Sequence, residues 1–213
     1  MSNNIDFPKS KWLNNWGIDQ ENAKYLDDFI KRTKPEIILE TGTFEAQSTY
    51  VMAQAANYNN NNCHIYTIDY DGDPTTILDK KDWLLLKDLR NKNLEKIKNN
   101  FKNVTVKFLE GDSRIVLKSL FKDNNIKKIN LFFQDSMHFK DGIIEEWDLV
   151  KKYIYKGCYA IFDDLKLKGV QEFRDWFNNK YKNKLFQCNS EKIGHGLFIA
   201  KKITNKGEEI LNN

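Results

Sequence analysis

The amino-acid sequence predicts an α/β protein with a doubly wound, mostly parallel sheet of seven strands and helices on both faces. Short apolar runs alternate about five times with stretches of helical periodicity, a pattern typical of β-α units joined by crossover connections. Two more strands near the C-terminus have no helix between them, so they can pair antiparallel and close the sheet. No long linker divides the 213 residues, and we therefore expect a single domain over residues 1–201.

The N-terminal part of this domain, residues 1–34, is expected to form a helical cap. Apolar side chains from Ala23 to Ile30 recur at helical spacing, and Pro35 ends the helix. Two tryptophans earlier in the cap, Trp12 and Trp16, are expected to cover a substrate pocket. Residues 70–83 are expected to form another wall of the same pocket.

The segments after Pro35 alternate between strands and helices, as a parallel sheet requires. Strands are expected at the short apolar runs, and helices where apolar residues recur every three or four positions. The expected strands cover residues 36–40, 64–69, 104–109, 129–133, 159–162, 184–188 and 196–200. The expected helices cover residues 46–56, 83–101, 113–121, 142–155 and 170–181, and residues 202–213 are expected to form a flexible tail.

Composition argues against several classes of function. The 34 basic and 30 acidic residues give a net charge of +4, and the lysines are spread out rather than concentrated in the stripe of a nucleic-acid binder. The three cysteines lack CxxC spacing, which suits a reducing compartment. The N-terminus has no apolar signal core, and no apolar run approaches the ~20 residues that cross a bilayer. We therefore expect a cytoplasmic protein that binds neither nucleic acid nor membrane.

Four of the apolar runs end in acidic residues, and these acids are the most informative feature of the sequence. They are Glu40, Asp69, Asp135 and the pair Asp163–Asp164. The carboxyl ends of parallel strands meet at one edge of the sheet, where open α/β sheets bind their ligands. The sequence therefore predicts a site for a polar small molecule, with a cation, at that edge.

The first two acids lie in the half of the sheet that is expected to hold a nucleoside. Gly42 allows a tight turn after the first strand, and Ser48 is placed to donate a hydrogen bond near the next helix. Asp69 ends the second strand, where an acid can accept both hydroxyls of a ribose. Residues 111–113, after the third strand, are expected at an adenine edge. The chain lacks GxGxxG and GxxxxGK[ST], which disfavours nicotinamide and ATPase-type phosphate binding.

These residues resemble the class I S-adenosylmethionine-dependent methyltransferases over residues 20–201. The resemblance is carried by the loop Glu40-Thr41-Gly42, by Asp69, by Gly111-Asp112 and by the closing antiparallel pair. It implies S-adenosylmethionine as cofactor, with its methionine portion at the Gly42 loop, its ribose at Asp69 and its adenine at Asp112. Ala46 stands where that family commonly has a second glycine. The candidate cofactor-binding residues are Glu40, Gly42, Thr43, Ser48, Asp69, Gly111, Asp112, Ser113 and Asp135.

The later acids lie where two neighbouring strands end. Asp135 is followed by His138, and Asp163 and Asp164 come directly after the next strand. Three carboxylates that converge repel one another unless they share a hard cation, and Mg²⁺ prefers oxygen ligands. Zinc fits less well, because cysteine ligands are missing and only one histidine is nearby.

The pattern Asp-x-x-His followed by Asp-Asp resembles the metal-dependent small-molecule O-methyltransferases. It is most similar to the branch with the macrocin-type sugar O-methyltransferases and the proteins labelled cephalosporin hydroxylase. The resemblance implies that Asp135, Asp163 and Asp164 bind magnesium. It also implies that His138 and Asp135 are catalytic, with His138 as the general base for a metal-bound hydroxyl. Lys140 is an alternative base, because catechol-type enzymes use a lysine just after their aspartate.

Each of these assignments has a structural alternative. Asp135 and Asp163 can instead cap the following helices. His138 can be a surface residue, and His195 can be a turn residue or can border the pocket.

The sequence thus predicts a magnesium-dependent O-methyltransferase that acts on a small hydroxylated acceptor, such as a sugar or a natural-product intermediate. The alternatives are a non-catalytic small-molecule-binding module on the same fold and a methyltransferase for another class of acceptor. An iron hydroxylase is disfavoured, because its metal site needs two histidines and one carboxylate and only His138 is well placed. Homo-oligomer formation remains open.

Overall fold

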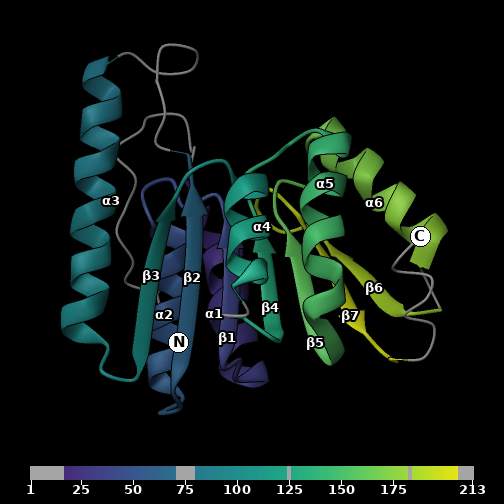
Figure 1. The fold of residues 1–213 in the computed structure, drawn as a ribbon, viewed down its shortest axis with the longest axis horizontal. Coiled ribbons are helices and arrows are strands. Elements are labelled where there is room, and N and C mark those ends of the chain that lie inside the picture. Colours follow the sequence, from purple (N-terminus) through teal and green to yellow (C-terminus); the bar gives the residue numbers. More distant parts are fainter. Residues whose placement is uncertain (1–16, 71–79, 124–125, 182–183, 206–213) are drawn as a thin grey trace.

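The computed structural model describes residues 17–70, 80–123, 126–181 and 184–205, and it confirms the predicted fold class. Seven strands form one sheet in the order β3-β2-β1-β4-β5-β7-β6 (Figure 1). The strands are β1 (Ile37–Thr41), β2 (Cys63–Asp69), β3 (Val104–Glu110), β4 (Ile129–Gln134), β5 (Ile154–Phe162), β6 (Phe186–Glu191) and β7 (Leu197–Lys202).

The strand order positions the candidate site. Strand β1 lies inside the sheet, third in this order, and pairs in parallel with both β2 and β4. The chain therefore winds outward in one direction through β2 and β3, and in the other through β4 and β5. Such a reversal point leaves a crevice at the carboxyl ends of the strands. Strand β7 runs antiparallel to β5 and to β6, so the predicted closing pair is confirmed.

Helices cover both faces of the sheet, as predicted. Figure 1 shows α4, α5 and α6 on one face and α1 and α2 on the other, with α3 beside the β3 edge. The helices are α1 (Gln20–Thr33), α2 (Gln47–Tyr58), α3 (Lys80–Asn100), α4 (Ser113–Lys122), α5 (Lys140–Val150) and α6 (Lys168–Tyr181). Helix α1 begins where Asp19 accepts hydrogen bonds from the backbone N–H groups of Glu21 and Asn22, the usual role of an N-cap residue.

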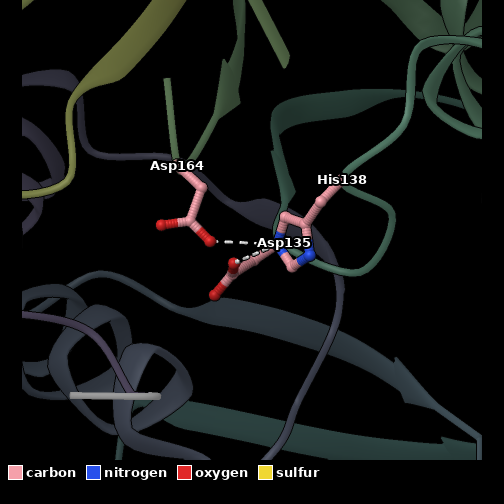
Figure 2. A group of neighbouring side chains, drawn as sticks. All are labelled: Asp135, His138 and Asp164. Carbon is pink, nitrogen blue, oxygen red and sulfur yellow. Dashed lines mark ion pairs between the residues drawn. The ribbon is translucent and has the colours of Figure 1, made fainter. Parts of the chain in front are cut away.

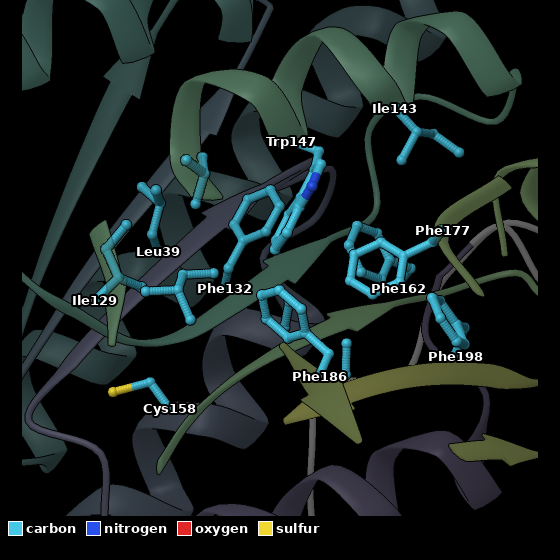
Figure 3. Close-up of a cluster of buried hydrophobic side chains, with 14 of the residues drawn as sticks. Leu39, Ile129, Phe132, Ile143, Trp147, Cys158, Phe162, Phe177, Phe186 and Phe198 are labelled. Atoms are coloured by element: carbon cyan, nitrogen blue, oxygen red, sulfur yellow. The ribbon is translucent and has the colours of Figure 1, made fainter. Parts of the chain in front are cut away.

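Aromatic side chains fill the core under α5 and α6. The Trp147 ring of α5 lies 6.0 Å from the Phe162 ring of β5 and 5.1 Å from the Phe177 ring of α6 (Figure 3). All three side chains are fully buried, and such ring pairs stabilise a core beyond the area that they bury. The loops after β4 and β5 therefore begin at the end of a closely packed aromatic core.

Some element boundaries differ from the sequence prediction. The helix expected at 142–155 ends at Val150, and β5 begins at Ile154 rather than at 159. Isoleucine and tyrosine at 153–155 suit both a helix and a strand, and only the pairing of Ile154 with Ile129 of β4 decides between them. The sixth strand is also later than expected, at Phe186–Glu191.

The two ends of the chain are only partly described. Residues 17–34 of the expected N-terminal cap are described, whereas Trp12, Trp16 and most of the wall expected at 70–83 lie outside the described residues. The expected tail began too early, because Lys202 pairs with Phe186 within the sheet and is buried. No helix in the described ranges is long and apolar enough to cross a membrane.

Candidate active site

The four groups of acids lie at the carboxyl ends of β1, β2, β4 and β5, along one edge of the sheet, as predicted. Backbone hydrogen bonds extend the pairing of the strands into the loops that follow. The N–H of Gly42 donates to Ile68 at 2.9 Å, that of Asp135 donates to Thr41 at 2.8 Å, and that of Asp163 donates to Gln134 at 3.0 Å. The loops after β1, β4 and β5 are therefore held side by side by the backbone itself.

Gly42 brings the two halves of the site together. Its φ of +91° lies in the left-handed region, which favours glycine. A Cβ at this position would lie 2.2 Å from the carbonyl oxygen of Asp135 and 2.8 Å from the backbone nitrogen of Ser136. Only a residue without a Cβ therefore fits at position 42, where the loop after β1 crosses the end of β4. The sequence predicted the tight turn but not this contact.

Glu40 lies beneath the Gly42 loop and is fully buried. Its carboxylate accepts hydrogen bonds from the Ser48 hydroxyl at 2.6 Å and from the Thr49 hydroxyl at 2.5 Å. Burial raises the pKa of Glu40 to about 7, although these hydroxyls favour its charged form. Glu40 and Ser48 thus fasten helix α2 to the end of β1.

Replacing Glu40 by glutamine should change the pH dependence of stability. A raised pKa means that folded Glu40 keeps its proton up to about pH 7, whereas the unfolded residue loses it near 4.5. Wild-type stability therefore falls as pH rises through this window, and the variant lacks that fall. We expect the free energy of unfolding of Glu40→Gln, relative to wild type, to rise by about 3 kcal/mol across it. Urea unfolding at both ends of the window measures the difference, and a difference that does not change with pH would contradict the assignment.

Asp69 is surrounded by backbone donors and by one buried cation. Its Oδ2 accepts from the N–H of Phe44 at 2.6 Å, and its Oδ1 accepts from the N–H of Tyr70 at 2.8 Å. Nη1 of the buried Arg90 lies 3.6 Å from Oδ2. The Asp69 side chain is 24% exposed, so it remains open to a ligand while it holds the Gly42 loop. Thr43, in contrast, is buried, and its hydroxyl contacts that of Thr67 at 2.6 Å.

The segment expected at the adenine edge begins helix α4. Asp112 is the N-cap residue, and it accepts from the Arg114 backbone N–H at 2.9 Å and from its guanidinium at 2.6 Å. The Arg114 guanidinium lowers the pKa of Asp112. Gly111, with φ +138°, makes the turn into the helix. A cavity of about 500 Å³ lies beside this segment, between α4 and α5, with Asp112, Arg114 and Ile115 on its wall.

The later acids form a compact cluster with His138. Figure 2 shows the Asp164 and Asp135 carboxylates on the same side of the His138 ring, where both face Nε2, at 3.0 Å from Asp164 Oδ2 and at 3.7 Å from Asp135 Oδ1. Hydrogen bonds to Asp135 and Asp164 raise the pKa of His138 to about 10. Burial raises the pKa of Asp135 to about 6. Each of the three side chains offers one ligand atom, and these atoms lie within 4.8 Å of one another.

Asp163 points elsewhere. It is buried, and its Oδ1 accepts hydrogen bonds from the Asn22 side chain of α1 at 2.8 Å and from the N–H of Asp164 at 2.7 Å. The described candidate metal ligands are therefore Asp135, His138 and Asp164, without Asp163. Neither Asp135 nor Asp163 caps a helix, because α5 starts after Phe139 and α6 starts at Lys168.

The family of the chain follows from comparison with known proteins. Residues 39–165, more than half of the chain, match a family model described as a methyltransferase domain. The chain belongs to this methyltransferase family. The predicted resemblance to class I methyltransferases is thereby confirmed. Comparison with curated protein sequences finds no match.

Several solved structures have the same fold as this methyltransferase. The O-methyltransferase TomG from Streptomyces achromogenes, involved in tomaymycin synthesis and solved with SAM, aligns with a TM-score of 0.66 at 16% identity, covering 90% of this chain and 83% of TomG. A putative caffeoyl-CoA O-methyltransferase from Staphylococcus aureus aligns with a TM-score of 0.62 at 18% identity, covering 92% and 86%. An O-methyltransferase from Bacillus cereus, in complex with SAH, aligns with a TM-score of 0.65 at 15% identity, covering 89% and 84%. At these identities the likeness establishes the fold.

Two more residues of the methyltransferase reach the site: His195, for which the sequence left a turn role and a place at the pocket open, and Glu146, which the sequence analysis did not single out. Nδ1 of His195, from the turn before β7, lies 3.2 Å from Asp164 Oδ1, so Asp164 lies between two histidines. The His195 backbone N–H donates to Asp19 at 2.7 Å, which links that turn to the start of α1. Glu146 of α5 is fully buried beside the loop after β4. Its position in the apolar stripe of α5, between Ile143 and Val150, was the available signal.

Proposed function

We propose that this methyltransferase uses S-adenosylmethionine to methylate a hydroxyl group of a small acceptor. The observation that carries the proposal is the cluster of Asp135, His138 and Asp164 directly beside the Gly42 loop. A loop suited to the methionine portion of the cofactor thus adjoins a base and two acids. This neighbourhood suits a reaction that removes a proton from a hydroxyl and delivers its oxygen to a methyl group.

The proposed cofactor site runs along the edge from β4 to β3. Asp69, partly exposed at the end of β2, would accept the ribose hydroxyls, and Gly42 would let the methionine portion approach the backbone. Gly111, Asp112 and Ser113 would border the adenine. The buried residues Glu40, Thr43 and Ser48 would act from beneath, by holding the loop in shape.

The donor set also fits a divalent cation. Asp135 and Asp164 present carboxylate oxygens within 4.8 Å of each other, which suits Mg²⁺ with waters in its other positions. When bound, the cation would lower the pKa of an acceptor hydroxyl and orient it. Asp163 would support the site through the backbone of Asp164 rather than as a direct ligand.

His138 would serve as the general base. The facing carboxylates hold a proton on its ring, because each favours the imidazolium form. A cation held by the two carboxylates would weaken their hold on that proton, which would pass to solvent, and the free Nε2 would then accept the proton of an acceptor hydroxyl. Asp135 and Asp164 would orient the ring, and the resulting alkoxide would attack the sulfonium methyl in line, breaking its bond to sulfur and releasing S-adenosylhomocysteine.

Titration calorimetry with S-adenosylmethionine and its demethylated product tests the cofactor assignment. We expect both to bind, and we expect Asp69→Asn to weaken binding at least about tenfold by removing charge-assisted hydrogen bonds. The matched control is Asp88→Asn, an exposed aspartate of α3 that pairs with Lys92. The control should bind like wild type. Absence of binding by wild type at high micromolar ligand would overturn the proposed function.

A further inference from the structure

Glu146 is a carboxylate in the core of the molecule, and three separate segments donate hydrogen bonds to it. Its Oε2 accepts from the hydroxyl of Thr41 at 3.2 Å, and its Oε1 accepts from that of Ser136 at 2.6 Å. The hydroxyl of Ser113 donates to the same Oε1. Glu146 is 0% exposed, and its hydrogen bonds from Thr41 and Ser113 are buried, whereas the one from Ser136 is partly buried.

The three donors come from the segments that form the proposed site. Thr41 ends β1 directly before Gly42, and Ser113 begins α4 directly after Asp112. Ser136 directly follows Asp135 on the way to His138. One carboxylate therefore contacts the two loops assigned to the cofactor and the loop assigned to acid-base chemistry.

The surroundings of Glu146 make a purely structural role a poor explanation. Its neighbours on the inner face of α5, Ile143, Trp147 and Val150, are fully buried and apolar. Burial raises the pKa of Glu146, whereas its hydroxyl partners oppose that rise. A well-packed apolar side chain often stabilises such a position more than a buried charge does. A fully satisfied polar network instead fixes one geometry of the groups that it joins.

We propose that Glu146 is a positioning residue that holds the cofactor loops and the Asp135–His138 loop in register. Its hydroxyl contacts, rather than its charge, carry this role. The proposal rests on the proposed function, because that function defines what the loops bind. It assigns to Glu146 no contact with the cofactor, the cation or the acceptor.

Two substitutions of Glu146 separate hydrogen bonding from charge. Glu146→Gln keeps one carbonyl oxygen for Ser113 and Ser136, and Thr41 can turn its hydroxyl to accept from the new amide. Glu146→Leu removes every acceptor at similar volume. The matched control is Asp148→Asn on the same helix, because Asp148 contacts Lys151 and is 46% exposed.

Two further substitutions remove single contacts of the network. Ser113→Ala should act on the cofactor side alone, and Ser136→Ala should act on the acid-base side alone. They keep the proposal open to refutation if Glu146→Leu fails to fold.

Three measurements read the outcome: affinity for S-adenosylhomocysteine without metal, affinity for Mn²⁺ with that ligand bound, and hydrogen exchange over residues 111–114 and 135–139. We expect Glu146→Leu to weaken both affinities at least about tenfold and to speed exchange in both segments. Both affinities of Glu146→Gln and of Asp148→Asn should stay within about threefold of wild type, a smaller change than the loss of one charge-assisted hydrogen bond would cause. Ser113→Ala should weaken only the binding of S-adenosylhomocysteine, and Ser136→Ala should weaken only the binding of Mn²⁺.

Several results would overturn the proposal. Wild-type affinities and exchange in folded Glu146→Leu would remove the positioning role. Equal losses in Glu146→Gln and Glu146→Leu would assign the effect to charge. Serine variants that change neither affinity, or both equally, would also contradict it. If wild type bound neither ligand, the proposed function would fail, and faster exchange confined to Glu146→Leu would still support the positioning role.

Discussion

Replacement of Asp164 by asparagine is expected to weaken Mn²⁺ binding by about 100-fold or more, because the proposed site loses one of its two carboxylates. Turnover with any accepted substrate should fall by a similar factor. Asparagine suits this position, since Asp164 has a φ of +56° and asparagine tolerates the left-handed region better than most residues. The backbone should therefore stay in place while the charge is lost.

The affinity of the Asp164→Asn variant for S-adenosylhomocysteine separates a local effect from a collapse of the site. We expect it to stay within about twofold of wild type, because Asp164 lies on the acid-base side, away from Asp69. Asp175→Asn, at an exposed aspartate of α6, is the control and should change neither affinity. Unchanged Mn²⁺ binding in Asp164→Asn, or loss of both ligands together, would show that the metal assignment is wrong.

Replacement of Gly42 by alanine is expected to lower the free energy of unfolding by about 2–5 kcal/mol. The left-handed backbone costs a residue with Cβ roughly 1–2 kcal/mol, and overpacking against the backbone of Asp135 adds about 1–3 kcal/mol. The atoms that the new Cβ would meet, the carbonyl oxygen of Asp135 and the nitrogen of Ser136, belong to the loop after β4, so that loop must shift. Affinities for the nucleoside and for Mn²⁺ should both fall.

Gly157 provides a matched control for the backbone contribution. Its φ is +88°, close to that of Gly42, yet a Cβ there would meet nothing within 4 Å. Gly157→Ala should therefore cost only the strain, about 1–2 kcal/mol, with wild-type affinities. Denaturant unfolding of both variants gives the comparison. Equal destabilisation, with binding intact in Gly42→Ala, would contradict the crossing of the two loops as the reason for glycine.

Much of the fold was predictable, because apolar runs and helical periodicity record burial directly. The acids at the strand ends could be located at one edge for the same reason, since a parallel sheet brings the carboxyl ends of its strands together. The predicted element boundaries were wrong where the same residues suit both a helix and a strand. At residues 151–155, only pairing with β4 decides between the two.

The details of the site were less predictable, because they depend on where each side chain points. Asp163 and Asp164 are adjacent, but the backbone turns at Asp164, whose φ is +56°, and the sequence does not show that the two carboxylates then point to different partners. The sequence does not say that Asn22 of α1 binds the first of them. His195 and Glu146 reach the site from distant segments, and their contacts exist only after the chain has folded.

A crystal structure grown with S-adenosylhomocysteine and Mn²⁺ would test the proposed site most directly. We expect an anomalous peak within coordination distance of the carboxylates of Asp135 and Asp164. The ribose of the ligand should lie at Asp69, and its sulfur should face the metal. A nucleoside bound elsewhere, or a metal peak away from Asp135 and Asp164, would contradict the assignment of this edge of the sheet to methyl transfer.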